Sequence, residues 1–226
     1  MIGETIDYQN HINMFTGIVE TVGSIIDLKN DKDNYEVTIQ VENKADFLSD
    51  CQIGDSISCS GICLTVIEFD SNKNWFKVGI SIETLRRTTI EKMWTSSENA
   101  HKINLERAMG SGNHRFGGHY VQGHVDTIAE VVEAVEEGDS VNFKYKLRDI
   151  ENVKYIVEKG FITVDGASLT ITNVDDDKGT FGVSMIKHTR DVLAKRPIGT
   201  FINVEVDVTG KMIAKQVDLY MKKYTK

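Results

Sequence analysis

The chain of 226 residues is long enough for one large domain or two small ones, and its 40% apolar and 27% charged residues are ordinary for a soluble globular protein. The net charge of −8 argues against a surface that binds duplex nucleic acid. The cysteines Cys51, Cys59 and Cys63 are odd in number and have no CxxC spacing, so neither a disulfide framework nor a zinc site is predicted.

Residues 1–13 form a polar stretch before a second methionine, Met14. This stretch lacks the basic start and the apolar run of a signal peptide, and no apolar run in the chain approaches the ~20 residues that span a bilayer. We therefore interpret residues 1–13 as a flexible extension, and we predict a cytoplasmic protein without membrane or nucleic-acid partners.

Residues 14–110 are predicted to form the first of two β domains. Within them, Tyr35, Val37, Ile39 and Val41 alternate with polar residues, which is the period-two pattern of a half-buried strand. Several short segments of this kind, separated by Gly, Asn and Asp turns, indicate a small closed barrel or a sandwich.

Residues 117–208 repeat the first half at a shift of about 105 residues. The run GDSISCSGICLTVIEFD (54–70) aligns with KGFITVDGASLTITNVD (159–175), and FTGIVETVGSI (15–25) aligns with VQGHVDTIAEV (121–131) at a shift of 106. A repeat this long indicates a duplicated domain, because solenoid repeats are only about 20 to 50 residues long. The glycines and polar residues between the halves are typical of a linker.

Two helical segments are predicted in the second part of the chain. Within 149–158, Ile150, Val153 and Val157 recur at helical spacing. A helix without a counterpart in the first half is predicted for residues 209–226. The apolar residues on one face of this helix are Ile213, Val217, Tyr220, Met221 and Tyr224. Either packing on the chain's own barrels or self-association around a symmetry axis would cover this face.

Polar side chains occupy matched strand positions in the two halves, in the patterns GxCLTV (61–66) and GxSLTI (166–171). Alternate residues of a strand face the same side, so these patterns present paired polar groups that could hold the polar edge of a planar ligand. The pairs are Cys63 with Thr65 and Ser168 with Thr170. The purely structural alternative is a packed cysteine beside threonines that favour strands.

The halves also differ in polarity at matched positions. The differing pairs are Ile18 and His124, Ser60 and Asp165, and Cys63 and Ser168. Because duplicated cores need only apolar equivalence, these differences predict two related pockets with different roles. Lys159 and Asp207 are further candidates, although a solvated charge at the end of a strand is the ordinary role of a lysine.

His119 and His124 lie five residues apart. They lack the helical i, i+4 spacing of paired zinc ligands and have no nearby cysteine, so no metal site is predicted. An acid–base or hydrogen-bonding role is favoured for one of them, because imidazole titrates near neutral pH.

Several long motifs in a fixed order resemble those of the riboflavin synthase family. They are MFTGIVE (14–20), SGICLTV (60–66), NLERAM (104–109), GGHYVQGHVD (117–126), KGFITVDGASLTI (159–171) and NVEVD (203–207). The resemblance extends from Met14 to about residue 220, and the stretch GHYVQGHVDT is most similar to fungal members.

The resemblance implies an all-β fold of two similar six-stranded Greek-key barrels in tandem (14–110 and 117–208), followed by a C-terminal α-helix (209–226) that joins three chains. It implies active sites between the N-terminal barrel of one subunit and the C-terminal barrel of the next. The implied substrate is 6,7-dimethyl-8-ribityllumazine, of which one molecule donates a four-carbon unit to another. No metal or redox cofactor is implied, because the acidic C7 methyl of the lumazine supplies the carbon nucleophile.

Position matching to the family assigns substrate contacts to both halves. The first pocket is expected to contain Gly17, Ile18, Val19, Cys63, Leu64, Thr65, Gly79, Ile80, Ser81, Ile82, Glu83 and Thr84. The second is expected to contain Gly123, His124, Val125, Lys159, Asp165, Ser168, Leu169, Thr170, Ser184, Met185, Ile186, Lys187, His188 and Thr189. The candidate catalytic residues are His124, Cys63, Ser168, Asp207, Phe15 and His119, without individual roles. The segment MIKHTR (185–190) departs from the Pro-Glu-Thr-Leu sequence of many relatives, so backbone contacts are expected there.

Two other functions fit the same pattern. Lumazine or flavin antenna proteins share the duplicated barrel and bind a chromophore without turnover, but the candidate catalytic side chains favour an enzyme. A barrel that only binds other proteins would leave the polar differences between the halves without a purpose.

Overall fold

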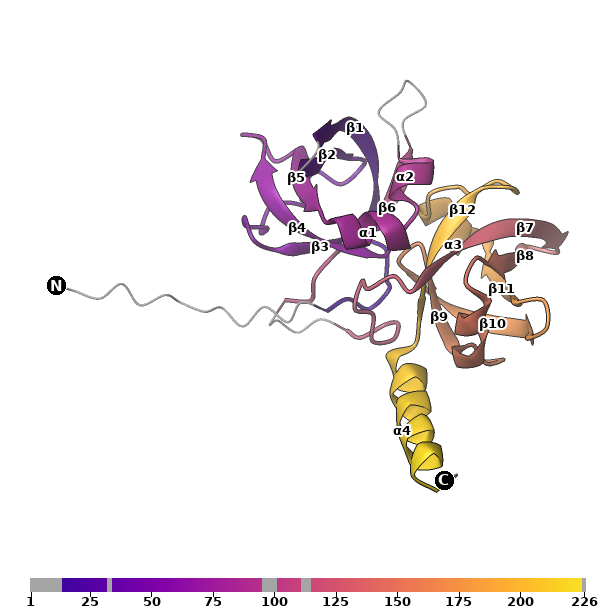
Figure 1. The fold of residues 1–226 in the computed structure, drawn as a ribbon. Helices are drawn as coiled ribbons and strands as arrows, with labels where there is room; N and C mark the ends of the chain where they lie inside the picture. The colour runs from indigo at the N-terminus through magenta and orange to yellow at the C-terminus, as the bar shows by residue number, and fades with distance from the viewer. Residues whose placement is uncertain (1–13, 32–33, 95–100, 111–114, 225–226) are drawn as a thin grey trace.

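The computed structural model describes residues 14–31, 34–94, 101–110 and 115–224. The predicted extension at 1–13 and part of the predicted linker therefore lie outside the described residues. The described chain forms two closed six-stranded antiparallel barrels, which lie side by side, and a C-terminal helix that projects away from them (Figure 1). This architecture confirms the predicted all-β fold of two barrels and one terminal helix.

The first barrel follows the strand order β1-β2-β5-β4-β3-β6 and closes through β6 onto β1. Its elements are β1 (Thr21–Asp31), β2 (Asn34–Val41), β3 (Ser56–Cys59), β4 (Ile62–Phe69), β5 (Trp75–Ile80), α1 (Ile82–Arg87), α2 (Ile90–Met93) and β6 (Lys102–Arg107). The predicted alternating segment is β2, in which Val37 and Ile39 are buried in the barrel core.

The second barrel has the same order, β7-β8-β11-β10-β9-β12, and closes through β12 onto β7. Its elements are β7 (Thr127–Glu137), β8 (Ser140–Leu147), the 3-10 helix η1 (Ile150–Tyr155), β9 (Phe161–Val164), β10 (Ala167–Asp175), β11 (Thr180–Ile186), α3 (Lys187–Val192) and β12 (Phe201–Val206). The helix α4 (Val208–Tyr224) follows at the C-terminus.

The internal repeat is reproduced down to irregularities in the strands. The pairing register shifts between Ile25 and Asp27 in the first barrel, and between Val131 and Glu133 in the second. These irregularities lie at matched positions, so the two barrels bend at the same places. Each barrel also encloses its own cluster of buried apolar side chains.

Two reciprocal contacts join the barrels. Phe15 and Val121 form an antiparallel bridge, with N–H···O distances of 2.8 Å and 3.1 Å in the two directions. Gly61 and Gly166 meet so closely that a Cβ on either one would lie 2.8 Å from the backbone nitrogen of the other. Because each contact pairs a residue with its own repeat partner, the two halves are related by an approximate twofold axis.

The helical segments differ from the expectation in one respect. The segment predicted within 149–158 is the short 3-10 helix η1, and it buries Val153 while Ile150 and Val157 remain exposed. The three apolar residues of the predicted segment therefore do not form one buried face. No helix in the described ranges is both long and apolar enough to cross a membrane.

Candidate active site

Glu106, near the end of β6, holds the loop that enters the first barrel. Its two carboxylate oxygens accept hydrogen bonds from the backbone N–H groups of Thr16 and Gly17, at 2.7 Å and 3.0 Å. Gly17 has a φ of 77°, a left-handed conformation that glycine adopts without strain. The following side chain, Ile18, is thereby left exposed.

Glu205 on β12 holds the matched loop of the second half in the same way. Its oxygens accept hydrogen bonds from the backbone N–H groups of Gln122 and His124, at 2.8 Å and 2.9 Å. Gly123 between them has a φ of 76°. The backbone that presents Ile18 in one half therefore presents an exposed imidazole, His124, in the other.

Each glycine loop lies against the opposite barrel. The carbonyl of Gly17 accepts a hydrogen bond from the backbone N–H of Ser168, and the carbonyl of Gly123 accepts one from that of Cys63, both at 2.8 Å. The sequence matching groups Gly17–Val19 with the first half and Gly123–Val125 with the second, whereas these hydrogen bonds join each segment to the opposite barrel. The twofold relationship between the halves exchanges the two segments.

One pocket shows this exchange directly. A cavity of about 460 Å³ is lined by residues of both halves. Those expected from the sequence are Cys63, Glu83, Thr84, Gly123, His124 and Val125. The structure thus brings two catalytic candidates, Cys63 and His124, to the walls of the same cavity.

The thiol of Cys63 is partly buried in this wall. Burial raises its pKa above the ordinary value, against a hydrogen bond with Ser56 that lowers it. A thiol with a raised pKa is protonated at neutral pH, so Cys63 offers an S–H donor and a weak acceptor rather than a thiolate nucleophile.

His119 and Ser168 form the most direct contact between catalytic candidates. Nδ1 of His119 lies 2.7 Å from the hydroxyl oxygen of Ser168, and Nε2 lies 3.2 Å from that of Thr163. The imidazole is buried and stacks on the ring of Phe161, with centroids 5.1 Å apart and planes 7° from parallel. Both ring nitrogens are thus occupied, and the orientation of the ring is fixed.

Burial lowers the pKa of His119, while the negative charge of Asp207 acts in the opposite direction. The neutral imidazole is therefore the resting form at pH 7. Asp207 itself precedes α4, and its carboxylate accepts a hydrogen bond from the backbone N–H of Thr209 at 2.9 Å. This residue connects the electrostatics of His119 to the start of the C-terminal helix.

The remaining expected contacts divide by the face of the strand on which they lie. Exposed or partly exposed side chains on the outer faces and helix starts are those of Val19, Thr65, Ser81, Ile82, Lys159, Thr170, Ser184, Ile186, Lys187, His188 and Thr189, with Gly79 exposed among them. Leu64, Ile80, Leu169 and Met185 pack against the barrel cores instead, which leaves mainly their backbone to face a ligand.

Two further candidates are placed away from these outer faces. Asp165 is buried in an ion pair with Arg196, with nitrogen and oxygen 2.5 Å apart, and it lines a different cavity. Phe15 is completely buried beside Val121, so its ring has a packing role at the contact between the barrels.

The sequence patterns did not identify several residues near the candidate sites. Arg87, Asn152 and Lys211 also line the cavity of Cys63 and His124. Arg87 lies one helical turn after Glu83 and pairs with it at 3.0 Å, an i, i+4 relationship that the sequence does contain. Nothing local indicates Lys211, because only the folded chain brings the start of α4 to this cavity. Within the described ranges, no group of three or more His, Cys, Asp or Glu side chains is positioned to hold a metal ion.

Comparisons with known proteins agree with the duplicated fold. A family model described as lumazine binding domain matches residues 16–108 and again 122–207. Riboflavin synthase of Saccharomyces cerevisiae is 50% identical over 213 residues, which is 90% of this chain and 86% of that protein. Riboflavin synthase of Schizosaccharomyces pombe is 43% identical over 94% of this chain and 98% of its own length. That of Bacillus subtilis is 41% identical over 88% of this chain and 87% of its own length.

Solved structures are similar at the level of the fold. The crystal structure of LumP complexed with riboflavin matches with a TM-score of 0.73 and 21% identity, over 86% of this chain and 100% of that chain. LumP complexed with 6,7-dimethyl-8-(1'-D-ribityl) lumazine gives a TM-score of 0.72 at 22% identity, over 86% and 99% of the two chains.

Proposed function

This chain belongs to the riboflavin synthase family, and from that premise we propose how its residues carry out the family's reaction. The reaction is a dismutation in which two molecules of 6,7-dimethyl-8-ribityllumazine yield riboflavin and 5-amino-6-(D-ribitylamino)uracil, the last step of riboflavin biosynthesis. One lumazine donates a four-carbon unit and the other accepts it, so the enzyme is a transferase that holds two like molecules in unlike roles.

Orientation is the main contribution of the protein. Holding two reactants in register can lower a barrier by ~7 to 11 kcal/mol, against roughly 3 to 5 kcal/mol for one well-placed acid or base. The acidic C7 methyl of the lumazine supplies the carbon nucleophile, so the chain has to orient two rings, move protons and stabilise charge on the rings.

Two unlike pockets serve the two lumazines. The first combines Cys63, Thr65 and the segment 79–84 with the loop 123–125 of the second half. The second combines Lys159, the strand 168–170 and the segment 184–189 with the loop 17–19 of the first half. The observation that supports this proposal is the pair of equivalent glycine loops, each hydrogen-bonded to the opposite barrel at 2.8 Å, one followed by the exposed Ile18 and the other by the exposed His124.

His119 and Ser168 together transfer a proton in the second pocket. With the imidazole neutral, Nδ1 accepts the hydroxyl proton of Ser168 and Nε2–H donates to Thr163, as the two distances of 2.7 Å and 3.2 Å allow. The serine oxygen can then take a proton from the substrate as its own passes to the ring, and the charge of Asp207 stabilises the imidazolium that forms.

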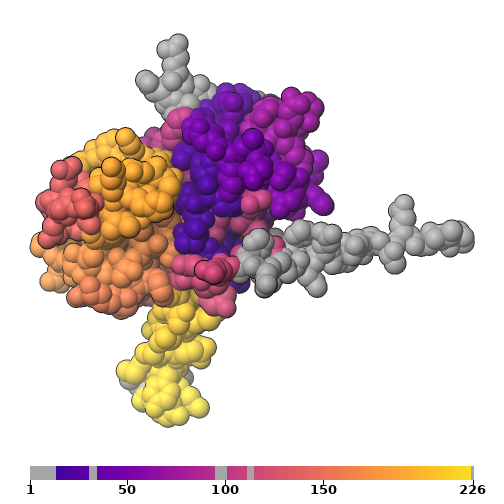
Figure 2. All heavy atoms as spheres, turned by 180° about the vertical axis from the view of Figure 1, so that it is seen from behind, coloured from indigo at the N-terminus to yellow at the C-terminus, as the bar shows by residue number. Residues whose placement is uncertain are grey.

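Three chains assemble around α4, with each active site built between the first barrel of one subunit and the second barrel of the next. The helix projects from the barrels (Figure 2), and its large apolar side chains are half-exposed or more. Those side chains are Met212, Ile213, Val217, Leu219, Tyr220, Met221 and Tyr224. Identical copies can bury this surface around a common axis. Sedimentation equilibrium at micromolar concentration should give the mass of three chains, and a monomer or dimer would contradict this assembly.

We also propose a cytoplasmic location, which the three free cysteines support because disulfides are rare in that compartment.

Turnover separates this enzyme from a barrel that only binds a chromophore. Purified protein mixed with the lumazine should convert it, with one riboflavin formed for two lumazines consumed, as followed by absorbance and chromatography. Saturable binding of unchanged lumazine would identify a binding protein, and calorimetry without any binding of lumazine or riboflavin would favour a protein-interaction module.

A further inference from the structure

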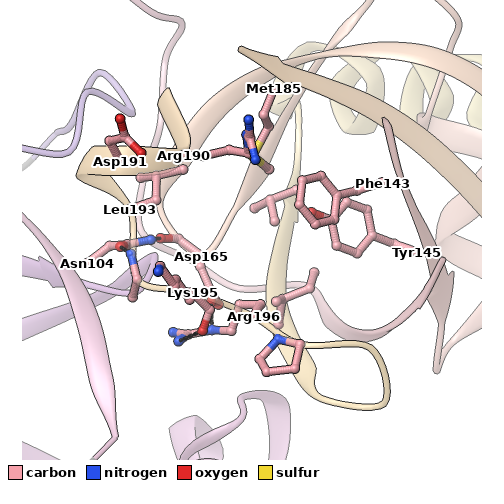
Figure 3. Close-up of a pocket in the computed structure, with 14 residues that line it drawn as sticks. Asn104, Phe143, Tyr145, Asp165, Met185, Arg190, Asp191, Leu193, Lys195 and Arg196 are labelled. Atoms are coloured by element: carbon pink, nitrogen blue, oxygen red, sulfur yellow. Dashed lines mark hydrogen bonds and ion pairs between the residues drawn. The ribbon is translucent and has the colours of Figure 1, made fainter. Parts of the chain in front are cut away.

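A further cavity lies at one end of the second barrel, apart from the proposed substrate pockets. Its volume is about 450 Å³, within the range of small-molecule sites. Phe143 and Tyr145 of β8 form one wall, and the segment that follows α3 forms the opposite wall with Asp165 and Arg196 (Figure 3).

This cavity faces the inside of the barrel, whereas the proposed substrate contacts face outward. Met185 lines the cavity and is buried, while Ser184 and Ile186 on either side of it in β11 are exposed. Because alternate residues of a strand face opposite sides, a molecule in this cavity and one on the outer face of β11 would be separated by the strand.

The cavity exists because the two halves close the ends of their barrels differently. In the first half, α2 covers the end and buries Ile90 and Trp94 completely or almost completely. The matched positions in the second half are Lys195 and Gly199, in a segment without helix that contains Pro197. Neither residue can replace the buried apolar side chains, so the end of the second barrel stays open.

Two polar groups face this cavity. The hydroxyl of Tyr145, a side chain only 2% exposed, points toward the cavity (Figure 3). Nε of Arg190 is buried and has no hydrogen-bond partner among the described residues, although a terminal nitrogen of the same guanidinium reaches a backbone carbonyl at 3.5 Å. Buried donors are normally satisfied, so the unpartnered Nε–H of Arg190, at a cavity that the Tyr145 hydroxyl also faces, indicates a ligand that accepts hydrogen bonds.

The charges around the cavity indicate the charge of the ligand. Arg196 is neutralised by Asp165, and both are almost completely buried. Arg190 and Lys195 are the other cations of the lining, against the single carboxylate of Asp191. The remaining lining is largely apolar or aromatic.

We propose that this cavity is a binding site for a small aromatic molecule with one anionic group, placed with its ring against Phe143 and Tyr145 and its anion at Arg190. The site is separate from the substrate pockets, and nothing in the family's reaction requires it. A ligand here contacts Met185 in β11 and the end of α3, the elements whose outer residues belong to the second substrate pocket, so occupancy can affect turnover.

The probe for this site is 1-naphthoate, titrated into the full-length protein by calorimetry with and without saturating riboflavin. Binding at one site per chain is expected under both conditions, and the neutral 1-naphthamide should bind about tenfold or more weakly because it cannot form the charged hydrogen bond. Absence of binding, complete competition by riboflavin, or equal binding of the amide would each overturn the proposal.

Two variants locate the site. Arg190→Gln should weaken naphthoate binding about tenfold or more, whereas Arg86→Gln, an exposed arginine near the end of the matched helix α1, should leave it unchanged. Tyr145→Phe should also weaken binding, because it removes the hydroxyl that faces the cavity while keeping the aromatic ring. Naphthoate affinity that is unchanged in both Arg190→Gln and Tyr145→Phe would place the ligand elsewhere and refute the assignment.

Discussion

Asn104 and Asn203 join the two barrels by the same hydrogen bond made in opposite directions. The side-chain amide of Asn104 donates to the backbone carbonyl of Asp165 at 2.9 Å, and that of Asn203 donates to the carbonyl of Ser60 at 2.8 Å. Each asparagine also accepts a hydrogen bond from a backbone N–H of the segment after α1 or α3. One side chain in each half therefore fixes both the contact between the barrels and the segment that follows the short helix, α1 or α3, of the other half.

Replacement of Asn203 by alanine should destabilise the protein by about 2 to 4 kcal/mol, because it leaves the buried carbonyl of Ser60 and the N–H of Thr89 without partners. Urea unfolding followed by tryptophan fluorescence measures this loss. Asn173→Ala, at an exposed asparagine of β10, is the matched control and should change stability by less than about 0.5 kcal/mol. A small effect at Asn203 would mean that the contact does not hold the barrels together.

His119 and Ser168 should behave as one catalytic unit. Ser168→Ala and His119→Gln are each expected to lower kcat about 100-fold, and the double variant should be no slower than the slower single one. Because burial lowers the pKa of His119, the acid limb of the kcat profile should lie below pH ~6.5 and should disappear in His119→Gln. Single-turnover rates from pH 5 to 8 measure both effects, and simple addition of the two losses would contradict the relay.

His124 and Cys63 should affect turnover more than binding. Alanine at either position is expected to reduce kcat by about tenfold or more while the Kd of the lumazine changes little. The fold should survive in His124→Ala, because Glu205 holds the backbone N–H at this position and not the ring. Ile18→Ala, at the same place in the other loop, is the control and should weaken binding with kcat largely kept. An unchanged kcat in His124→Ala would remove this residue from the mechanism.

Lys159 occupies a left-handed position with a φ of 64°, where the first half has Gly54 with a φ of 97°. Lys159→Gly should change stability by less than about 1 kcal/mol, because relief of this strain offsets the greater freedom of glycine in the unfolded chain. Its kcat/KM should nevertheless fall about tenfold or more, since a charged contact to substrate is lost. Lys73→Gly provides the control at a φ of 53° outside the proposed pockets, and equal kinetics for the two variants would assign Lys159 a purely local role.

Glu106 should make stability depend on pH. Burial raises its pKa from 4.5 to about 7, against the hydrogen bonds from Thr16 and Gly17. The folded chain therefore retains this proton when the unfolded chain has lost it, so the stabilisation is complete below pH 4.5 and is lost as the pH rises through about 7. The slope is at most about 1.4 kcal/mol per pH unit, to be measured as the difference in urea stability between the wild type and Glu106→Gln.

The control for Glu106→Gln is Glu151→Gln, at an exposed glutamate of η1, which should keep the wild-type dependence of stability on pH. If Glu106→Gln also kept that dependence, the proton would belong to another group.

Much of the fold follows from local pattern and repetition. The alternation that buries Val37 and Ile39 predicts a strand without any tertiary information. The shift of about 105 residues predicts two equivalent barrels, and it also places Cys63 and Ser168 at equivalent positions.

The arrangement of the site does not follow from such patterns. Sequence matching shows that Gly17 and Gly123 are equivalent, but only the twofold relationship in space shows that each contacts the opposite barrel. The contact between His119 and Thr163 is likewise created by folding, because the two residues lie 44 positions apart. The open end of the second barrel depends on a helix that one half has and the other lacks.

The exchange of the glycine loops has an evolutionary consequence. A single half-chain would lack one wall of its own pocket, and a second identical copy, docked through the same Phe15–Val121 and Gly61–Gly166 contacts, would have to supply it. An ancestor of one domain could therefore work only as a symmetric dimer, in which every change appeared twice. Fusion of two such copies into one chain would remove that constraint, and the two loops could then hold different residues, as Ile18 and His124 do here.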